Sequence, residues 1–320
     1  ESTMKTQSIF FALILMLSAS LMTSCITSDE PGLPIGDPYS SWTQFLQQNQ
    51  VQPKAFTLDP RENNEIQGPK GTVVRIPADA LMDPNGLAIT GPVQVFLREF
   101  YSRKDIVLSG VNTNSYSQML VTGGAIELRA ELNGSPLDLD PSASIAVAFP
   151  GKTDVNGYEN QMQQFVSDDD PLKPAQGFNW RMGNERPARV DTTNGSLGFI
   201  LNDVQLGYTN CDALYAIPSN DRTQFEVIVS GDDGGETQVF MLVKDLSTVI
   251  NLYTRNGPAY TTYAGSVPMG LEATLVAISV VNGQLHYGSK KITVAGNDNF
   301  TVAVNPGTTS GLENLLEFPF

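Results

Sequence analysis

Hydrophobic and polar residues alternate with a period of two along most of the chain, which is the pattern of half-buried β-strands. Residues 93–100 place Val93, Val95 and Leu97 on one side of an extended strand and polar side chains on the other. Residues 125–132 repeat this alternation, and clusters of Asp, Asn, Gly and Pro interrupt it about every 8–12 residues. Short strands divided by turns predict an all-β protein built from β-sandwiches.

The regularity of the alternation varies along the chain, and this variation indicates how the chain is divided into domains. It is clear over residues 53–150, looser over 151–220 and clear again over 221–320, where Asn282-Gly283 gives a strong hairpin signal. A chain of 320 residues is too long for one small core. We expect two β-sandwich domains, at 53–150 and 221–320, joined by a smaller β-rich region.

Two short segments replace the alternation with helical spacing. Apolar residues three and four positions apart predict a short helix over residues 41–50 and an amphipathic helix over residues 244–253. Residues 105–108 are assigned to a further short strand.

The first residues follow a different pattern. Residues 9–17 form an unbroken apolar run, which fits the hydrophobic region of a signal peptide and is too short to span a bilayer, for which about 20 residues are needed. Residues 1–24 are therefore predicted to be a signal peptide. Residues 25–52 begin with Cys25, contain several Pro and Gly residues, and are predicted to form a flexible tether that ends in the short helix.

The end of the predicted signal peptide carries a recognisable motif. Residues 21–25, LMTSC, resemble the lipobox of bacterial lipoproteins, which is cleaved directly before its cysteine. The resemblance implies that Cys25 becomes the first mature residue and is lipidated, since several acyl chains anchor a protein stably. The following Asp29-Glu30 is similar to the export signal of Bacteroidota surface lipoproteins. This resemblance implies lipid anchoring in the outer membrane and exposure on the cell surface. An ordinary signal peptide with an incidental cysteine is the alternative.

Segments of the folded region resemble a ZU5-like β-sandwich module that occurs in uncharacterised Bacteroidota surface lipoproteins. The resemblance rests on turn glycines, a strand-ending proline and alternating core positions, at residues 71–81, 89–93, 98–101, 106–110 and 122–124. Residues 207–212 and the immunoglobulin-like carboxy-terminal strands also look like parts of such proteins. ZU5-like modules serve protein interaction, so the resemblance implies a binding role, and it supplies no activity.

The charge of the chain excludes one class of partner. The formal net charge is -15 and the pI is about 4.4. Nucleic-acid binding depends on a basic face that neutralises phosphates. We therefore expect no nucleic-acid partner.

Cysteine and histidine are too scarce for several chemistries. The chain contains Cys25, Cys211 and His286 and no others of these types. A zinc site takes three or four ligands, and these residues are scattered. Cys211 is predicted to be a buried thiol, with a nucleophilic role as the alternative, and His286 is predicted to occupy an ordinary strand position. We expect no catalytic residue, no resident metal and no cofactor.

Acidic clusters provide the oxygen ligands that calcium prefers. Asp168–Asp170 is one such cluster, and Asp232–Asp233 with Glu236 is another, but neither fits the EF-hand loop pattern. Solvated turns are the expected outcome, and calcium binding stays open. Asp138 and Asp140 are the candidates for a carboxylate pair of a glycoside hydrolase, a chemistry that also requires a cleft.

Two further surface features are weighed. Exposed aromatic side chains would form a carbohydrate platform, although core packing is the expected role of these residues: Trp42, Trp180, Tyr253, Tyr260 and Tyr263. Asp191-Thr192-Thr193 is similar to the short O-glycosylation acceptor of Bacteroidota.

These observations predict a lipid-anchored, non-catalytic surface protein that acts as a binding or scaffolding module at the outer membrane. Its partner would be a protein or a glycan. A glycan-binding accessory protein of a polysaccharide-uptake system is the alternative, and a carboxylate-dependent hydrolase is a third possibility.

Overall fold

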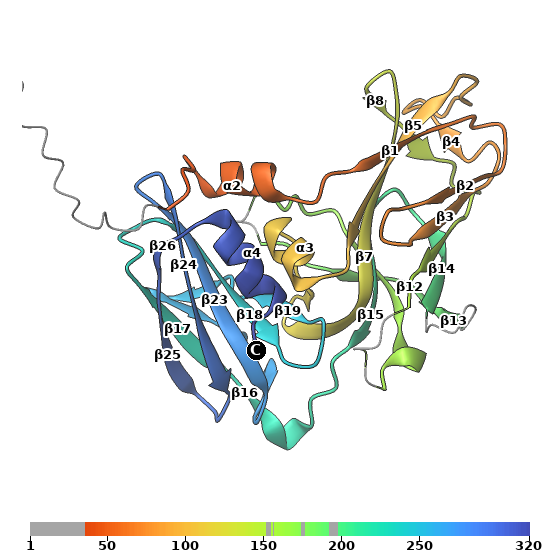
Figure 1. Cartoon of the computed structure of the whole chain (residues 1–320). Helices are drawn as coiled ribbons and strands as arrows, with labels where there is room; N and C mark the ends of the chain where they lie inside the picture. Colours follow the sequence, from red (N-terminus) through yellow and green to blue (C-terminus); the bar gives the residue numbers. More distant parts are fainter. Residues whose placement is uncertain (1–35, 152–154, 156, 174–176, 192–197) are drawn as a thin grey trace, which may run out of the picture. The chain divides into compact units, whose positions relative to one another are not determined.

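The computed structural model describes residues 36–320 except 152–154, 156, 174–176 and 192–197 (Figure 1). Strands dominate these residues, and the longest helix, α4 (Thr309–Glu317), has nine residues. The predicted all-β class is confirmed. Among the described helices none is long and apolar enough to cross a membrane. The predicted signal peptide and Cys25 lie outside the described residues.

The first sandwich consists of two antiparallel sheets. Its larger sheet has the order β1–β5–β7–β15–β11–β12, with β6 and β8 paired to β7. Its smaller sheet has the order β13–β14–β10–β3–β2, and the pair β4–β9 lies beside them. The bounds are β1 Lys54–Leu58, β2 Asn64–Gln67, β3 Val73–Ile76, β4 Leu81–Met82, β5 Val93–Phe100, β6 Asn114–Ser115, β7 Gln118–Leu132, β8 Ser135–Pro136, β9 Asp138–Leu139, β10 Ile145–Phe149, β11 Gln163–Ser167, β12 Arg181–Pro187, β13 Arg189–Asp191, β14 Gly198–Val204 and β15 Gly207–Leu214.

Residues 151–220, expected to connect two sandwiches, supply strands to both sheets of the first one. β15 pairs with the central strand β7 from Gly207 opposite Leu128 to Leu214 opposite Leu120. The alternation is loose here because β15 buries polar side chains, including Asn210, which is fully buried. Buried polar residues with partners inside the protein do not follow the hydrophobic pattern of a strand.

The second sandwich also has two larger sheets. One has the order β20–β21–β17–β25, in which β17 and β25 are parallel, and the other has the order β19–β18–β23–β24–β26. The bounds are β16 Arg222–Thr223, β17 Phe225–Ser230, β18 Glu236–Val243, β19 Val249–Asn251, β20 Thr254–Asn256, β21 Ala259–Thr261, β22 Val267–Pro268, β23 Glu272–Val281, β24 Gln284–Thr293, β25 Asp298–Ala303 and β26 Asn305–Pro306. After Glu272, every residue of β23 is buried, so both faces of this strand are covered.

The predicted helix over residues 41–50 is confirmed as α2 (Trp42–Asn49), with Ser41 as its N-cap. The predicted helix over residues 244–253 is wrong, because Val249–Asn251 is strand β19, paired with β18. The β-branched residues of segment 244–253 favour an extended chain, and the pairing of β19 with β18 overrides the helical spacing.

The strand assigned to residues 105–108 is also wrong, because they belong to helix α3 (Arg103–Leu108). A capping box begins this helix: Ser102 accepts from the Asp105 backbone N–H, and Asp105 accepts from the Ser102 backbone N–H.

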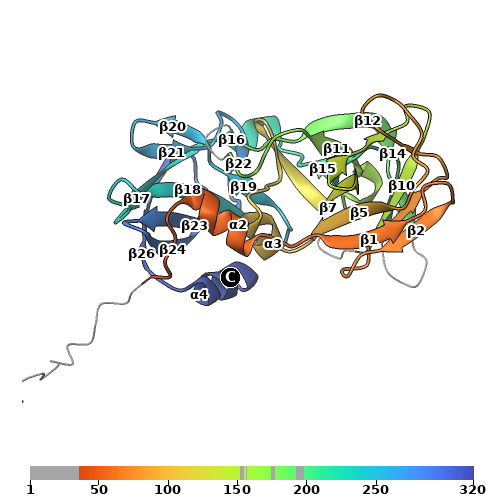
Figure 2. The same cartoon turned by 90° about the horizontal axis from the view of Figure 1, so that it is seen from above.

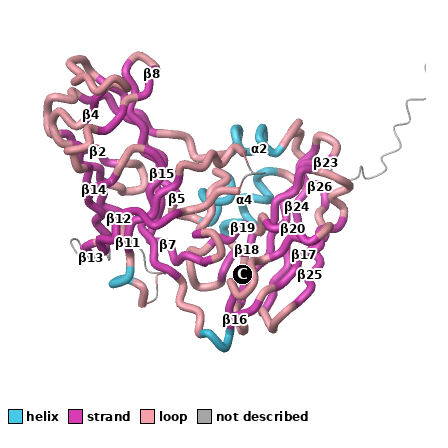
Figure 3. Tube along the Cα trace, turned by 180° about the vertical axis from the view of Figure 1, so that it is seen from behind, coloured by secondary structure: helices cyan, strands magenta, loops and turns pink. Residues whose placement is uncertain are grey.

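Helices α2, α3 and α4 lie where the two sandwiches meet (Figures 2 and 3). Trp42, Phe45 and Leu46 of α2 belong to a buried cluster. The cluster also contains residues of α3, of α4, of the larger sheet of the first sandwich and of the β19–β18–β23–β24–β26 sheet of the second. Backbone bonds join the sandwiches directly, since the Thr113 N–H donates to the Val249 carbonyl over 2.7 Å. Residues 36–320 therefore form one compact unit.

The segment that precedes α2 is held by the second sandwich. Asp37 donates its N–H to the Gly307 carbonyl over 3.1 Å, and its carbonyl accepts from the Leu285 N–H over 2.7 Å. Tyr39 donates its N–H to the Gly283 carbonyl over 3.0 Å. The chain therefore reaches α2 along the edge of β24.

Candidate functional site

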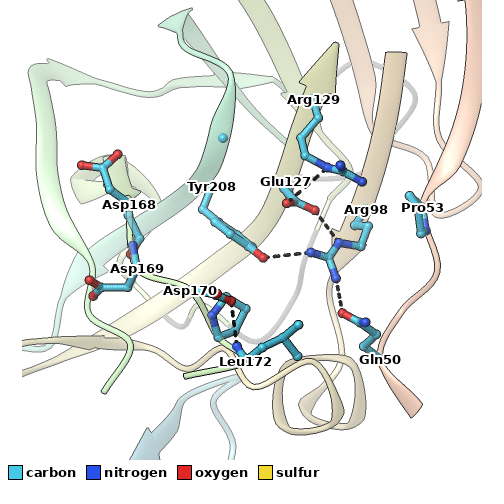
Figure 4. Close-up of a pocket in the computed structure, with 13 residues that line it drawn as sticks. Gln50, Pro53, Arg98, Glu127, Arg129, Asp168, Asp169, Asp170, Leu172 and Tyr208 are labelled. Atoms are coloured by element: carbon cyan, nitrogen blue, oxygen red, sulfur yellow. Dashed lines mark hydrogen bonds and ion pairs between the residues drawn. The ribbon is translucent and has the colours of Figure 1, made fainter. Parts of the chain in front are cut away.

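A pocket of ≈ 570 Å³ opens on the outer face of the large sheet of the first sandwich (Figure 4). The end of α2 forms one wall, and the loop at residues 168–172 forms another. The lining residues are Gln50, Pro53, Arg98, Glu127, Arg129, Ser167, Asp168, Asp169, Asp170, Pro171, Leu172, Gly207 and Tyr208.

The floor of this pocket is a row of side chains from four neighbouring strands. Arg98 of β5 lies opposite Glu127 of β7, which lies opposite Tyr208 of β15. Tyr208 in turn lies opposite Ser167 of β11. Residues directly opposite each other in antiparallel strands project from the same face, so the sheet register brings these four side chains together.

Arg98 is the centre of the floor. Its side chain is 11% exposed, and its Nε donates to Glu127. Its Nη1 donates to Gln50 Oε1 over 2.5 Å, and its Nη2 donates to the Tyr208 hydroxyl over 2.8 Å. Burial alone would lower the pKa of Arg98, but the hydrogen bond to Glu127 and the nearby Tyr208 outweigh it and raise the pKa. The guanidinium therefore stays charged and fixed in three directions.

Tyr208 lies between Arg98 and the acidic loop at residues 168–172. Burial, followed by the nearby Glu127 charge, raises the pKa of its hydroxyl, so the phenol stays neutral. Its ring stacks on Phe100 with centroids 6.3 Å apart and meets Phe178 edge-on at 5.3 Å. Since the hydroxyl oxygen accepts from Arg98, its own proton is available to donate to a ligand.

Charged side chains lie on both sides of Tyr208 (Figure 4). On one side Arg129, 45% exposed, stands over the Phe96 ring at 5.3 Å and its Nε is 3.5 Å from Glu127 Oε1. On the other side Asp168 pairs with Arg181 over 2.5 Å. Donors and acceptors therefore face the same space.

A second pocket of ≈ 530 Å³ adjoins the first and shares three of its residues, Ser167, Asp168 and Tyr208. It is also lined by Arg186 and Asp203, which pair over 2.6 Å. The two pockets therefore meet where β11 ends at Ser167 and β15 begins at Gly207.

Cys211 and His286 do not lie together. Cys211 is a free, fully buried thiol in β15 of the first sandwich, and burial raises its pKa well above the usual value. This confirms the predicted buried thiol. His286 lies in β24 of the second sandwich, as expected for a strand position. Burial lowers its pKa, an effect partly offset by Asp233.

The acidic candidates separate in the fold. Asp168–Asp170 lines the first pocket, whereas Asp232 accepts a hydrogen bond from Thr237 in the second sandwich. Asp138 and Asp140 lie around β9, outside both pockets, and Ser142 lowers the pKa of Asp140 through its hydrogen bonds. In the described part of the chain, no group of three or more Asp, Glu, His or Cys residues is placed to hold a metal ion.

Most of the aromatic candidates pack inside the protein. Trp42, Trp180 and Tyr260 are buried, and Tyr253 donates its hydroxyl to the Phe178 carbonyl over 2.8 Å. Tyr263 is 37% exposed. Core packing is therefore the role of Trp42, Trp180 and Tyr260, whereas Tyr253 is half-buried. In the glycosylation motif, Thr192 and Thr193 lie outside the described residues.

Sequence reasoning missed Arg98, Glu127 and Tyr208 as a group. The alternation marked Arg98 and Glu127 as polar strand positions, but nothing joined them to Tyr208, which lies 110 positions from Arg98. Comparison of the chain with models of known protein families and with curated proteins finds no match.

Proposed function

We propose that this chain is a non-catalytic surface protein, anchored in the outer membrane by a lipid on Cys25, which binds its ligand in the Arg98 pocket. The lipobox-like motif supports the anchor, and the β-rich body supports a binding module. In this proposal the first sandwich is a ZU5-like interaction module and the carboxy-terminal region is immunoglobulin-like.

The observation that carries the binding role is the fixed network beneath the pocket. Arg98 is held by Glu127, Gln50 and Tyr208, so a ligand meets side chains that are already ordered. A pre-ordered site loses less conformational entropy on binding. Arg98 and Tyr208 also keep one protonation state near neutral pH, which suits recognition better than proton transfer.

The pocket is tested by substituting its most accessible arginine. Arg129→Gln removes the charge on the wall, and we expect about tenfold weaker binding to the natural ligand, the loss of one charge-assisted hydrogen bond. Ligands are identified by passing glycan and peptide libraries over the immobilised protein. Arg75→Gln is the matched control, because Arg75 is similarly exposed and pairs with Glu65 outside both pockets. Equal binding by wild type and Arg129→Gln would contradict the site.

The anchor is tested separately. Cys25→Ala removes the thiol that would carry the lipid, and we expect the protein to move from the membrane fraction to the soluble fraction after cell lysis. Mass spectrometry of the wild-type protein should show acyl chains on residue 25. An unmodified Cys25 in membrane-bound protein would contradict the anchor.

The alternative function is a glycan-binding accessory protein of a polysaccharide-uptake system. One observation favours it: guanidinium donors and carboxylate acceptors line the same pocket. Glycan hydroxyls use both kinds of partner.

A further inference from the structure

We propose that the ligand of the two adjoining pockets is a neutral oligosaccharide. This inference rests on the proposed binding role of the Arg98 pocket and adds the chemical class of the ligand. Four features of the site favour this ligand: the pairing of charges, the spare hydrogen-bonding capacity, the length of the site and the strands that form its floor.

Every arginine that lines the two pockets is paired with a carboxylate that also lines them. The pairs are Arg98–Glu127, Arg129–Glu127, Arg181–Asp168 and Arg186–Asp203. Arg98 and Arg129 share Glu127, so the pairs alone leave one positive charge. Asp169 and Asp170 also line the first pocket and bring the two linings together to one net negative charge. An anionic polymer would need the opposite balance, an excess of basic groups.

The paired arginine and carboxylate side chains still have unused hydrogen-bond donors and acceptors. A guanidinium has five N–H donors and a carboxylate accepts about four hydrogen bonds. Arg181 uses one N–H on Asp168 in a contact where both side chains are largely exposed, at 52% and 83%. The remaining donors and acceptors lie side by side. A hydroxyl group donates and accepts at once, so a polyhydroxyl ligand satisfies both.

The site is long enough for several sugar units. The row from Arg98 to Ser167 crosses three strand spacings, about 14 Å at roughly 4.8 Å for each spacing. The second pocket continues from Ser167 and Asp168 toward Arg186. An extended oligomer therefore contacts more of these residues than a single sugar.

The strands of the floor argue against a peptide in extended form. Such peptides add to a free sheet edge and use backbone hydrogen bonds. β5, β7, β15 and β11 each have a neighbouring strand on both sides, so the floor of the first pocket offers no free sheet edge. β12, which lines the second pocket, is the last strand of the described sheet, so this point concerns the first pocket. Recognition at this floor depends on side chains, which suits a ligand with many hydroxyl groups.

The experiment uses the full chain on an array of neutral hexasaccharides, acidic oligosaccharides and peptides, followed by titration calorimetry with the best hexasaccharide. We expect binding to neutral hexasaccharides. The double variant Asp168→Asn/Arg181→Gln removes exposed groups of the site without disturbing the core, and we expect binding to weaken by at least about tenfold. The matched control, Glu65→Gln/Arg75→Gln, removes another exposed pair, which lies outside both pockets, and should bind as wild type.

Other outcomes overturn the inference in distinguishable ways. Binding of acidic oligosaccharides or peptides that is weakened by Asp168→Asn/Arg181→Gln would overturn the neutral glycan and retain the proposed binding site. Binding of neutral hexasaccharides that both double variants leave unchanged would place glycan recognition elsewhere. Absence of binding to all three classes would overturn the inference and count against the binding role of the pocket.

Discussion

The two sandwiches differ in how their large sheets are covered on the side that faces the helices. In the second sandwich, alternate residues of β18 and β23, such as Phe240 and Ile278, are buried in the same cluster as the helices. In the first sandwich, Phe100 and Ala125 join that cluster, but Arg98 and Arg129 lie beyond it and line the pocket. The pocket is therefore the part of a sheet face that the helices leave uncovered.

The largest expected effect on stability comes from weakening the packing of α2, which covers both sandwiches. Phe45 of α2 is fully buried among residues of both sandwiches. Phe45→Ala should lower the free energy of unfolding by about 3–5 kcal/mol, because a large cavity remains. Urea denaturation measures it, with Gln47→Ala on the exposed side of α2 as control. If Phe45→Ala cost less than about 1 kcal/mol, close to a surface substitution, α2 would not stabilise the junction.

The next largest effect on stability concerns the Arg98–Glu127 pair, on the part of the sheet face that the helices leave uncovered. Glu127→Leu leaves the Arg98 guanidinium largely buried without its carboxylate, and should lower the free energy of unfolding by about 3 kcal/mol. The double variant Arg98→Met/Glu127→Leu should recover most of that loss, since it removes both charges. The exposed Arg75–Glu65 pair provides the comparison, because Glu65→Gln should change stability by less than about 1 kcal/mol. No recovery in the double variant would show that Glu127 acts through other contacts.

The smallest effect is a pH dependence in the second sandwich. Burial lowers the folded-state pKa of His286 below its usual value of 6.5, so the unfolded chain binds the proton more readily. Stability from this residue is complete above pH 6.5 and is lost as the pH falls below it. The His286→Gln variant should lose less stability between pH 7.5 and pH 5 than wild type in thermal melts. An equal or steeper loss in the variant would contradict the lowered pKa.

The strands over residues 93–100 and 125–132 and helix α2 were predictable because their patterns are local. The helix predicted over residues 244–253 failed because β19 pairs with β18, a long-range contact that helical spacing does not report. The alternation over β15 was obscured because Asn210 and Asp212 are buried polar residues.

The pocket was not predictable from local patterns. It depends on the register that aligns Arg98, Glu127 and Tyr208, and on where α2 stops covering the sheet. The acidic loop was noticed, since Asp168–Asp170 stands out in the sequence, but its partner Arg181 lies 13 positions from Asp168, on the next strand. Registers between distant segments are set by tertiary packing.

The attachment of residues 37–39 to β24 has a mechanical consequence. A force applied at residue 36 reaches the body first through the bonds of Asp37 and Tyr39 to Leu285, Gly307 and Gly283. If the force acts along the direction of the segment, these bonds share the load. If it pulls the segment away from β24, they would break one after another. The second sandwich would take this strain before α2 and the floor of the first pocket.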